Sequence, residues 1–127
     1  MLKETIISIV IIIMIFTLDM FTQGYTRKTS QEITGKMTEL KTNLLKLNNE
    51  KIDKTVQEID EIWAKKHDRL AYYIEHDELE KVDTAIIEVK SYIETEDYSS
   101  AVAELDKGKF VLEHIEEKYS FNIQNVF

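Results

Sequence analysis

The stretch DELEKVDTAIIEVKSYI, residues 77–93, decides the fold class of this chain. Its apolar residues recur alternately three and four positions apart, which places them on one face of an α-helix and the charged residues on the other. That face consists of Leu79, Val82, Ile86, Val89 and Ile93. Asp77 and Glu80 have the spacing of a capping box, so the pattern predicts a helix that begins at Asp77.

Two helices are predicted upstream of this stretch. Thr29 and Glu32 form another capping box, and the helix that follows is expected to end near Asn48 and Asn49. Asp53 marks the next start, and that helix is expected to reach about Glu75. The two apolar faces are Ile33, Met37, Leu40, Leu44 and Leu47, and then Val56, Ile59, Ile62, Trp63, Leu70, Tyr73 and Ile74.

One helix is predicted downstream, after a break over residues 94–98. Its apolar face is Ala101, Leu105, Gly108, Leu112, Ile115 and Tyr119. Because this pattern runs through Gly108, the glycine is expected to permit close approach of a neighbouring helix rather than a turn. The tail, residues 121–127, is apolar enough to dock on the helices.

A weak internal repeat groups these helices in pairs. Six residues, Leu47, Glu50, Val56, Glu58, Ile59 and Asp60, align at an offset of 46 with Ile93, Glu96, Val102, Glu104, Leu105 and Asp106. The absence of proline and the presence of only three glycines also favour uninterrupted helices. We therefore predict an all-α fold of two antiparallel hairpins, arranged as a four-helix bundle or as a short helical-repeat-like stack.

The first 28 residues differ from the rest in composition. Residues 6–21 are almost wholly apolar and would form about 24 Å of helix, against a bilayer core of about 30 Å. We expect an uncleaved signal anchor; the alternatives are a signal peptide cleaved before Tyr25, with Thr22 and Gly24 preceding the cut, and a buried core helix. The predicted domains are therefore an anchor at 1–28 and an acidic helical domain at 29–127.

Charge and cysteine content exclude several functions. The net charge is -8, and because the first 28 residues carry +1, the remaining domain carries -9. Such a surface repels nucleic-acid phosphates. The chain has no cysteine, which excludes disulfides, zinc–thiolate sites and lipoprotein-type acylation. Flanking charges barely distinguish the two orientations of the anchor, and we expect the domain to lie outside the cell.

No residue pattern indicates a catalytic, cofactor-binding or metal site. His67 and His76 are out of phase on a helix and His114 lies on another helix, so a metal site is not expected. Between residues 74 and 97 the chain has nine acids and only two positively charged residues, Lys81 and Lys90. Such an excess of one charge is typical of a solvated helix face. Trp63 and Tyr73 are expected in the core. No phosphate-binding loop or nucleophile motif is present in the sequence, so we expect that the protein is not an enzyme.

Scattered residues resemble a known family. The hydrophobic start, Trp63, the cluster His76-Asp77-Glu78, the break Glu96-Asp97-Tyr98 and the pair Asn122-Ile123 are similar to a family of small uncharacterised helical proteins of clostridia-like Gram-positive bacteria. The resemblance covers the chain from about Leu45 onward, although the tail departs from it by ending in Val126-Phe127. It implies a membrane-tethered all-α domain of unknown function, with no catalytic residue to carry over.

Together these features lead us to expect a non-enzymatic, membrane-anchored helical module outside the cell. Its expected partners are the membrane, through the N-terminal segment, and an envelope or membrane protein. The apolar helix faces are also compatible with a homo-oligomer. The alternatives are a sensor domain that binds a small ligand or metal, and a secreted helical protein released by signal cleavage.

Overall fold

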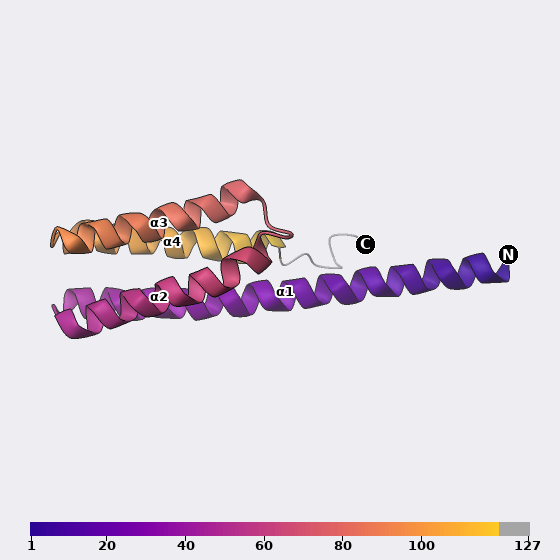
Figure 1. Cartoon of the computed structure of the whole chain (residues 1–127), viewed down its shortest axis with the longest axis horizontal. Helices are drawn as coiled ribbons and strands as arrows, with labels where there is room; N and C mark the ends of the chain where they lie inside the picture. Colours follow the sequence, from indigo (N-terminus) through magenta and orange to yellow (C-terminus); the bar gives the residue numbers. More distant parts are fainter. Residues whose placement is uncertain (120–127) are drawn as a thin grey trace.

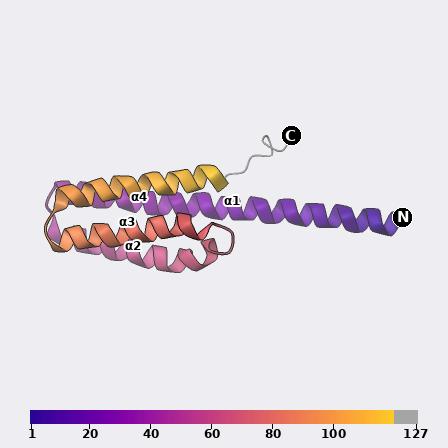
Figure 2. The same ribbon diagram turned by 90° about the horizontal axis from the view of Figure 1, so that it is seen from above.

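A computed structural model describes residues 1–119, which form four helices and no strand. The helices are α1 (Leu2–Leu45), α2 (Asn49–Leu70), α3 (His76–Glu94) and α4 (Tyr98–Tyr119). They run alternately up and down as an antiparallel bundle, and the N-terminal half of α1 extends far beyond it (Figures 1 and 2). The prediction of an all-α fold with two hairpins is confirmed, in its four-helix bundle form.

The helix α1 joins the predicted anchor to the bundle without a break. It has 44 residues, so the predicted helix start at Thr29 is wrong. A capping residue must leave the helical conformation, but Gly24 and the residues around it are helical. The hydroxyl of Thr26 instead donates to the carbonyl of Thr22 one turn earlier (2.8 Å), and Thr29 is buried. The boundary drawn between residues 28 and 29 therefore falls inside one continuous helix.

One hydrophobic core holds the four helices together. Ile33, Leu40, Ile52, Leu79 and Val82 are at most 1% exposed, and together they come from α1, α2 and α3. α1 packs on both α2 and α4, and α3 packs mainly on α4, whereas α2 and α3 meet less closely. Buried polar bonds fix the packing of α1: Ser30 Oγ donates to the carbonyl of Leu112 (3.2 Å), and Asn43 Nδ2 donates to Thr55 Oγ1 (3.1 Å).

The two turns at the closed end of the bundle, opposite the protruding part of α1, have the same geometry. In the first, the amides of Leu47 and Asn48 donate to Leu44 and Asn43, and in the second those of Glu96 and Asp97 donate to Ile93 and Tyr92. This is the Schellman pattern, with Leu47 and Glu96 at φ values of 56° and 58°. Equivalent turn residues are 49 apart, so the predicted offset of 46 is wrong.

Several predicted helix ends also move. Asn48 caps α2 by accepting from the Lys51 amide (3.2 Å), so the helix starts before Asp53. It ends at Leu70 rather than near Glu75, although Ile74 in the following turn remains buried. α3 begins at His76 with no side-chain cap, so Asp77 does not cap it. Leu47 lies in a turn and is 66% exposed, so its placement on an apolar face is wrong.

The hairpin of α3 and α4 follows the sequence pattern closely. Leu79, Val82, Ile86 and Val89 are buried, and Ile93 packs partly buried against them. A Cβ added at Gly108 would lie 3.2 Å from Ala85 Cβ and 3.3 Å from Met37 Cε. The prediction that Gly108 permits close helix approach is confirmed. The predicted docking of residues 121–127 lies outside the described residues.

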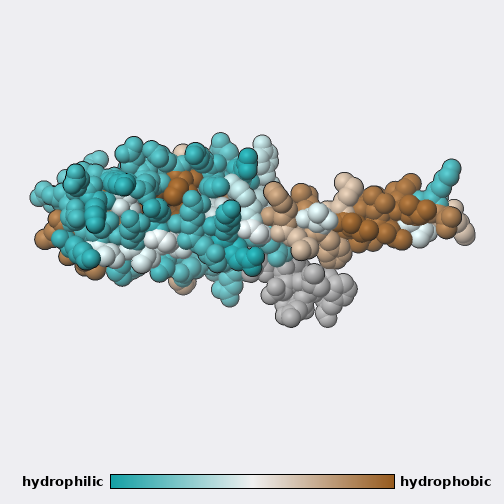
Figure 3. Space-filling view, turned by 90° about the horizontal axis from the view of Figure 1, so that it is seen from below, coloured by the Kyte–Doolittle hydropathy of each residue, from teal (hydrophilic) through white to brown (hydrophobic). Residues whose placement is uncertain are grey.

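The protruding part of α1 is apolar and exposed on all sides. Its large hydrophobic side chains between Ile6 and Phe21 are 40–71% exposed. In the space-filling view this segment forms a hydrophobic rod attached to a mainly hydrophilic bundle (Figure 3). The protruding segment up to Phe21 is called the apolar rod below. Among the described residues, α1 is the one helix long and apolar enough to cross a membrane, on the criteria of length and composition.

Candidate functional site

The three histidines lie apart, in different surroundings. His67 is on α2 beside Asp83, His76 is exposed at the start of α3, and His114 stacks on Phe110 in α4 with ring centroids 6.5 Å apart. Within residues 1–119 no three histidine, aspartate or glutamate side chains converge as they would to hold a metal ion. The geometry therefore gives no metal ligand set among these residues.

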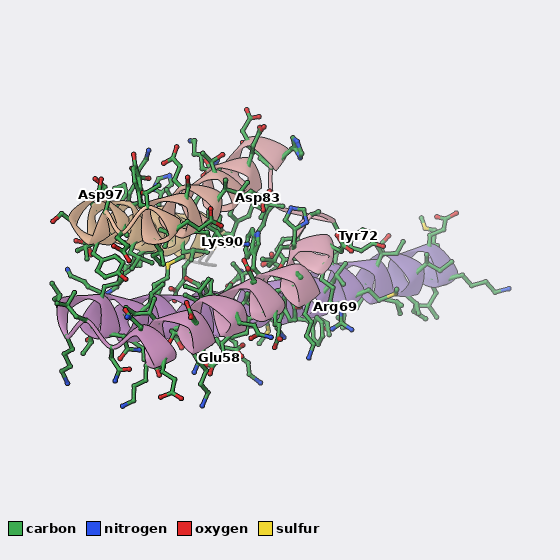
Figure 4. All side chains as sticks on the ribbon, turned by 60° about the vertical axis from the view of Figure 1, so that its left-hand side comes forward. Glu58, Arg69, Tyr72, Asp83, Lys90 and Asp97 are labelled. Atoms are coloured by element: carbon green, nitrogen blue, oxygen red, sulfur yellow. The ribbon has the colours of Figure 1, made fainter. Side chains whose placement is uncertain are left out.

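A polar cluster joins α2 to α3, the two neighbouring helices that pack least closely. The buried Trp63 indole donates to Asp83 Oδ1 (2.5 Å), and Asp83 Oδ2 lies 3.4 Å from His67 Nε2. The Trp63 and His67 rings meet edge to face, with centroids 5.5 Å apart. Lys90 and Asp60 form a second bridge between the same helices (2.7 Å). Figure 4 shows Asp83 and Lys90 on the side of α3 that faces α2. The expected burial of Trp63 is confirmed, whereas Tyr73 is half-buried.

The acids predicted to form one solvated face divide between two environments. Glu78 is only 7% exposed; its Oε1 lies 3.5 Å from Lys118 Nζ, and its Oε2 is buried without a hydrogen-bond partner. Lys118 also lies 3.5 Å from Glu75. Asp77, Glu80, Glu94, Glu96 and Asp97 remain exposed. The expectation of a wholly solvated acidic face is therefore wrong for Glu78, because α4 covers it and supplies a cation.

A pair of carboxyl groups links α3 to α4. The hydrogen bond from Glu88 raises the pKa of Glu104 above its usual value, and burial and the charge of Glu88 add to the rise. Lys107 Nζ is 3.9 Å from Glu104 Oε2, which is too far for a hydrogen bond. A shared proton between two carboxyl groups is the arrangement that acid chemistry uses. Here both side chains are half-buried, and the cavity that Glu104 borders has a volume of only about 10 Å³.

The interior that residues 1–119 enclose leaves little room for a ligand. The cavity between Met37, Ile59, Ala85 and Glu104 has a volume of about 10 Å³, roughly the space of one water probe. Larger hollows lie on the surface. One of about 580 Å³ runs along α3 and α4 past Asp77, Glu80, Lys81 and Lys107. These hollows suit contact with a macromolecule better than enclosure of a small molecule.

The end of the bundle nearest the apolar rod carries an aromatic and basic group that the sequence analysis did not single out. Lys66 Nζ and Arg69 Cζ lie 5.1 and 5.9 Å from the centroid of the Tyr25 ring. The Tyr73 hydroxyl bonds with Thr26 Oγ1 (2.6 Å) and donates to the Thr22 carbonyl (3.3 Å). Burial raises the pKa of the Tyr73 hydroxyl. Tyr25 and Lys66 are 41 positions apart in the sequence, and Thr26 and Tyr73 are 47 apart. No local sequence pattern predicts contacts over such separations.

The comparison with protein families covers nearly the whole bundle. Residues 20–126 match the family described as a domain of unknown function, DUF4363. The chain belongs to this family. The DUF4363 match starts within the apolar run and includes all of α2, α3 and α4. No curated protein and no solved structure matches the chain. The resemblance to a family of unknown function is confirmed to that extent.

Proposed function

We propose that this chain is a non-enzymatic, membrane-anchored module whose apolar N-terminal helix spans the bilayer and whose acidic bundle lies outside the cell. The observation that carries the proposal is the two-part character of α1. Its large side chains up to Phe21 are apolar and exposed, whereas from Thr26 onward one face of the same helix is buried in the bundle. Exposed apolar helix of this length is stable when lipid surrounds it.

The junction between the two parts supports a retained anchor over a cleaved signal peptide. Gly24 and Tyr25 lie within helical backbone, at the peptide bond that signal cleavage would break. Cleavage there would also remove Thr22, whose carbonyl accepts the hydrogen bond from Tyr73. Because α1 continues unbroken into the core, an inserted anchor would hold the whole bundle at a fixed distance from the membrane.

The partner that we propose is a basic surface on another envelope or membrane protein. Asp77 and Glu80 are exposed on α3, beside a hollow that Lys81 and Lys107 also line. Opposite charges across an interface speed association and select among partners, so a strongly acidic bundle favours a basic one.

Fractionation tests the anchor. The full-length chain should remain in the membrane pellet through washes with high salt and alkaline carbonate, and its mass should include residues 1–24. A protease added to intact cells should digest the bundle. Release by carbonate or a mature N-terminus at Tyr25 would contradict the anchor, and digestion only after lysis would place the bundle inside.

Cross-linking in membranes tests the partner. Charge reversal by Asp77→Lys with Glu80→Lys should abolish the cross-linked product. The matched control is Glu50→Lys with Asp53→Lys, two exposed acids at the same spacing at the start of α2. Equal cross-linking of both double variants would contradict a partner site on α3.

A further inference from the structure

We infer that the α1 and α2 side of the bundle, at the end next to the apolar rod, rests on the membrane surface and binds anionic lipid headgroups. The contact surface is a basic collar, defined as Arg27, Lys28, Lys65, Lys66 and Arg69, together with Tyr72. This inference rests on the proposed span of α1 and adds a second contact with the same membrane.

The hydrogen bonds of Tyr73 fix the height of this surface relative to the apolar run. Its hydroxyl donates to the carbonyl of Thr22, the residue directly after Phe21, which ends the run. The connection between α2 and α3 is therefore level with the point at which α1 would leave the hydrocarbon. Tyr72, beside Tyr73, is 89% exposed. In Figure 4, Tyr72 and Arg69 lie beside α1 where it leaves the bundle.

On the side of this end that α1 and α2 form, charge has the opposite sign to that of the chain as a whole, whereas the start of α3 and the end of α4 remain acidic. The segments 22–28 and 64–73 contain five lysines and arginines and one acid, Asp68, in a chain of net charge -8. Glu75, the next acid along the chain, lies 3.5 Å from Lys118. Arg27, Lys28, Lys65 and Arg69 are exposed. A local positive field beside a bilayer attracts anionic headgroups.

Tyr25 places two of these cations. Lys66 and Arg69 are both within 6 Å of its ring centroid, so the aromatic face holds two positive groups from α2 against α1. Tyr25 is only four residues from Phe21, about 6 Å along the helix axis. Tyrosines at this depth are typical of the membrane interface, where the ring meets lipid and the hydroxyl meets water.

A lipid headgroup is the occupant that this position favours. The surface belongs to the same rigid helix as the proposed span, so the membrane is present at high effective concentration. The hollow that we assign to a protein partner is lined by residues of α3 and α4 and shares none with the collar. The two contacts therefore use different residues of the bundle.

Single cysteines report the contact, because the chain has none of its own. Full-length Tyr72→Cys carries an environment-sensitive fluorophore, and Leu47→Cys, 66% exposed at the other end of α2, is the matched control. Both are reconstituted in vesicles of phosphatidylcholine, alone or mixed with phosphatidylglycerol. The label at 72 should shift to the blue and be quenched by brominated lipid in the mixed vesicles, and high salt should reverse both effects. The label at 47 should not respond.

Charge variants of the Tyr72→Cys chain test the collar. Lys66→Gln with Arg69→Gln should lower the ratio of docked to undocked protein about 30-fold in the mixed vesicles, equivalent to about 1 kcal/mol for each cation. Lys51→Gln with Lys54→Gln, at the far end of the same helix, should leave it unchanged. Helical circular dichroism shows that each variant is folded.

The outcomes separate the two proposals. If the chain floats with carbonate-washed vesicles but the labels at 72 and 47 behave alike, the span holds and the docking is wrong. Equal shielding in both lipid mixtures would contradict the role of the cations. Shielding in native membranes but not in pure lipid would assign the collar to a protein instead. Extraction of the chain by carbonate would overturn both proposals.

Discussion

The indole N–H of Trp63 donates to Asp83 Oδ1 at 2.5 Å, across the two neighbouring helices that pack least closely. Trp63 is only 6% exposed, so its N–H has little access to water. The second oxygen of Asp83 faces His67 Nε2 at 3.4 Å. One carboxylate therefore satisfies a buried donor and also joins α2 to α3, which pack less closely than the other neighbouring helices.

Removal of this carboxylate should be costly. We expect Asp83→Ala to lower the free energy of unfolding by about 1–3 kcal/mol, because it leaves the buried indole donor unpaired. The control Asp60→Ala removes the other bridge between these helices, the exposed pair with Lys90, and should cost less than about 1 kcal/mol. Denaturant unfolding of the full-length chain in mild detergent measures both. Equal losses would show that the indole bond contributes no more than a surface ion pair.

A methyl group at Gly108 should separate three helices. Its Cβ would lie 3.2 Å from Ala85 Cβ and 3.3 Å from Met37 Cε. An overpacking cost of about 1–3 kcal/mol should outweigh the gain of about 1 kcal/mol in helix propensity, so Gly108→Ala should destabilise the bundle by up to about 2 kcal/mol. At Gly35, in the part of α1 that packs in the bundle, nothing lies within 4 Å of an added Cβ. Gly35→Ala should therefore stabilise by about 0.5–1 kcal/mol through helix propensity. Thermal melts of the two variants should shift in opposite directions, and a shared direction would contradict the close approach.

The sequence predicted the helix faces well because burial in a bundle repeats every few residues along one chain segment. Leu79, Val82, Ile86 and Val89 needed only their mutual spacing to be recognised. The start of the first helix could not be found in this way. Thr29 and Glu32 match a capping box, but a cap exists only where the chain departs from helix, and nothing between residues 22 and 28 forces it to do so.

The candidate sites depend on helix register, which the sequence does not display. Trp63 meets Asp83, Glu88 meets Glu104, and Tyr25 meets Lys66 across pairs of helices. Each residue is an unremarkable member of its own helix. Leu47 shows the converse error, since its spacing continues the apolar stripe of Leu40 and Leu44 although the chain has already turned.

The two Schellman turns hold non-glycine residues in a left-handed conformation. Leu47 and Glu96 have φ values of 56° and 58°, at the position where glycine is the usual residue. Leu47→Gly and Glu96→Gly should each raise the free energy of unfolding by about 1 kcal/mol, since glycine adopts this conformation without a Cβ clash.

The control for these turn variants is Leu45→Gly, at the last residue of α1. Leu45 is also exposed, but its backbone is helical, so glycine there should destabilise by about 1 kcal/mol. Chemical denaturation compares the three variants. Destabilisation by Leu47→Gly would mean that its exposed side chain contributes contacts that outweigh the backbone strain.

The carboxyl pair of Glu88 and Glu104 should make stability depend on pH. The hydrogen bond from Glu88 raises the pKa of Glu104 above its ordinary value of 4.5 in the folded chain. The native state therefore takes up a proton before the unfolded chain does. As pH falls through the raised pKa of the folded chain, this group should add stability, and the gain is complete below the pKa of the unfolded chain. Glu104→Gln should keep a hydrogen bond to Glu88 without the second charge, so it should stabilise the chain by about 1 kcal/mol at neutral pH. The difference in stability between the variant and the natural chain should then shrink as pH falls.

Glu113→Gln, on the exposed side of the same helix, controls for loss of one negative charge from an acidic protein. Denaturant unfolding of both chains across this pH range measures the difference in their free energies of unfolding. A difference that stays constant with pH would show that Glu104 is ionised in the folded and the unfolded chain throughout, which would contradict the prediction.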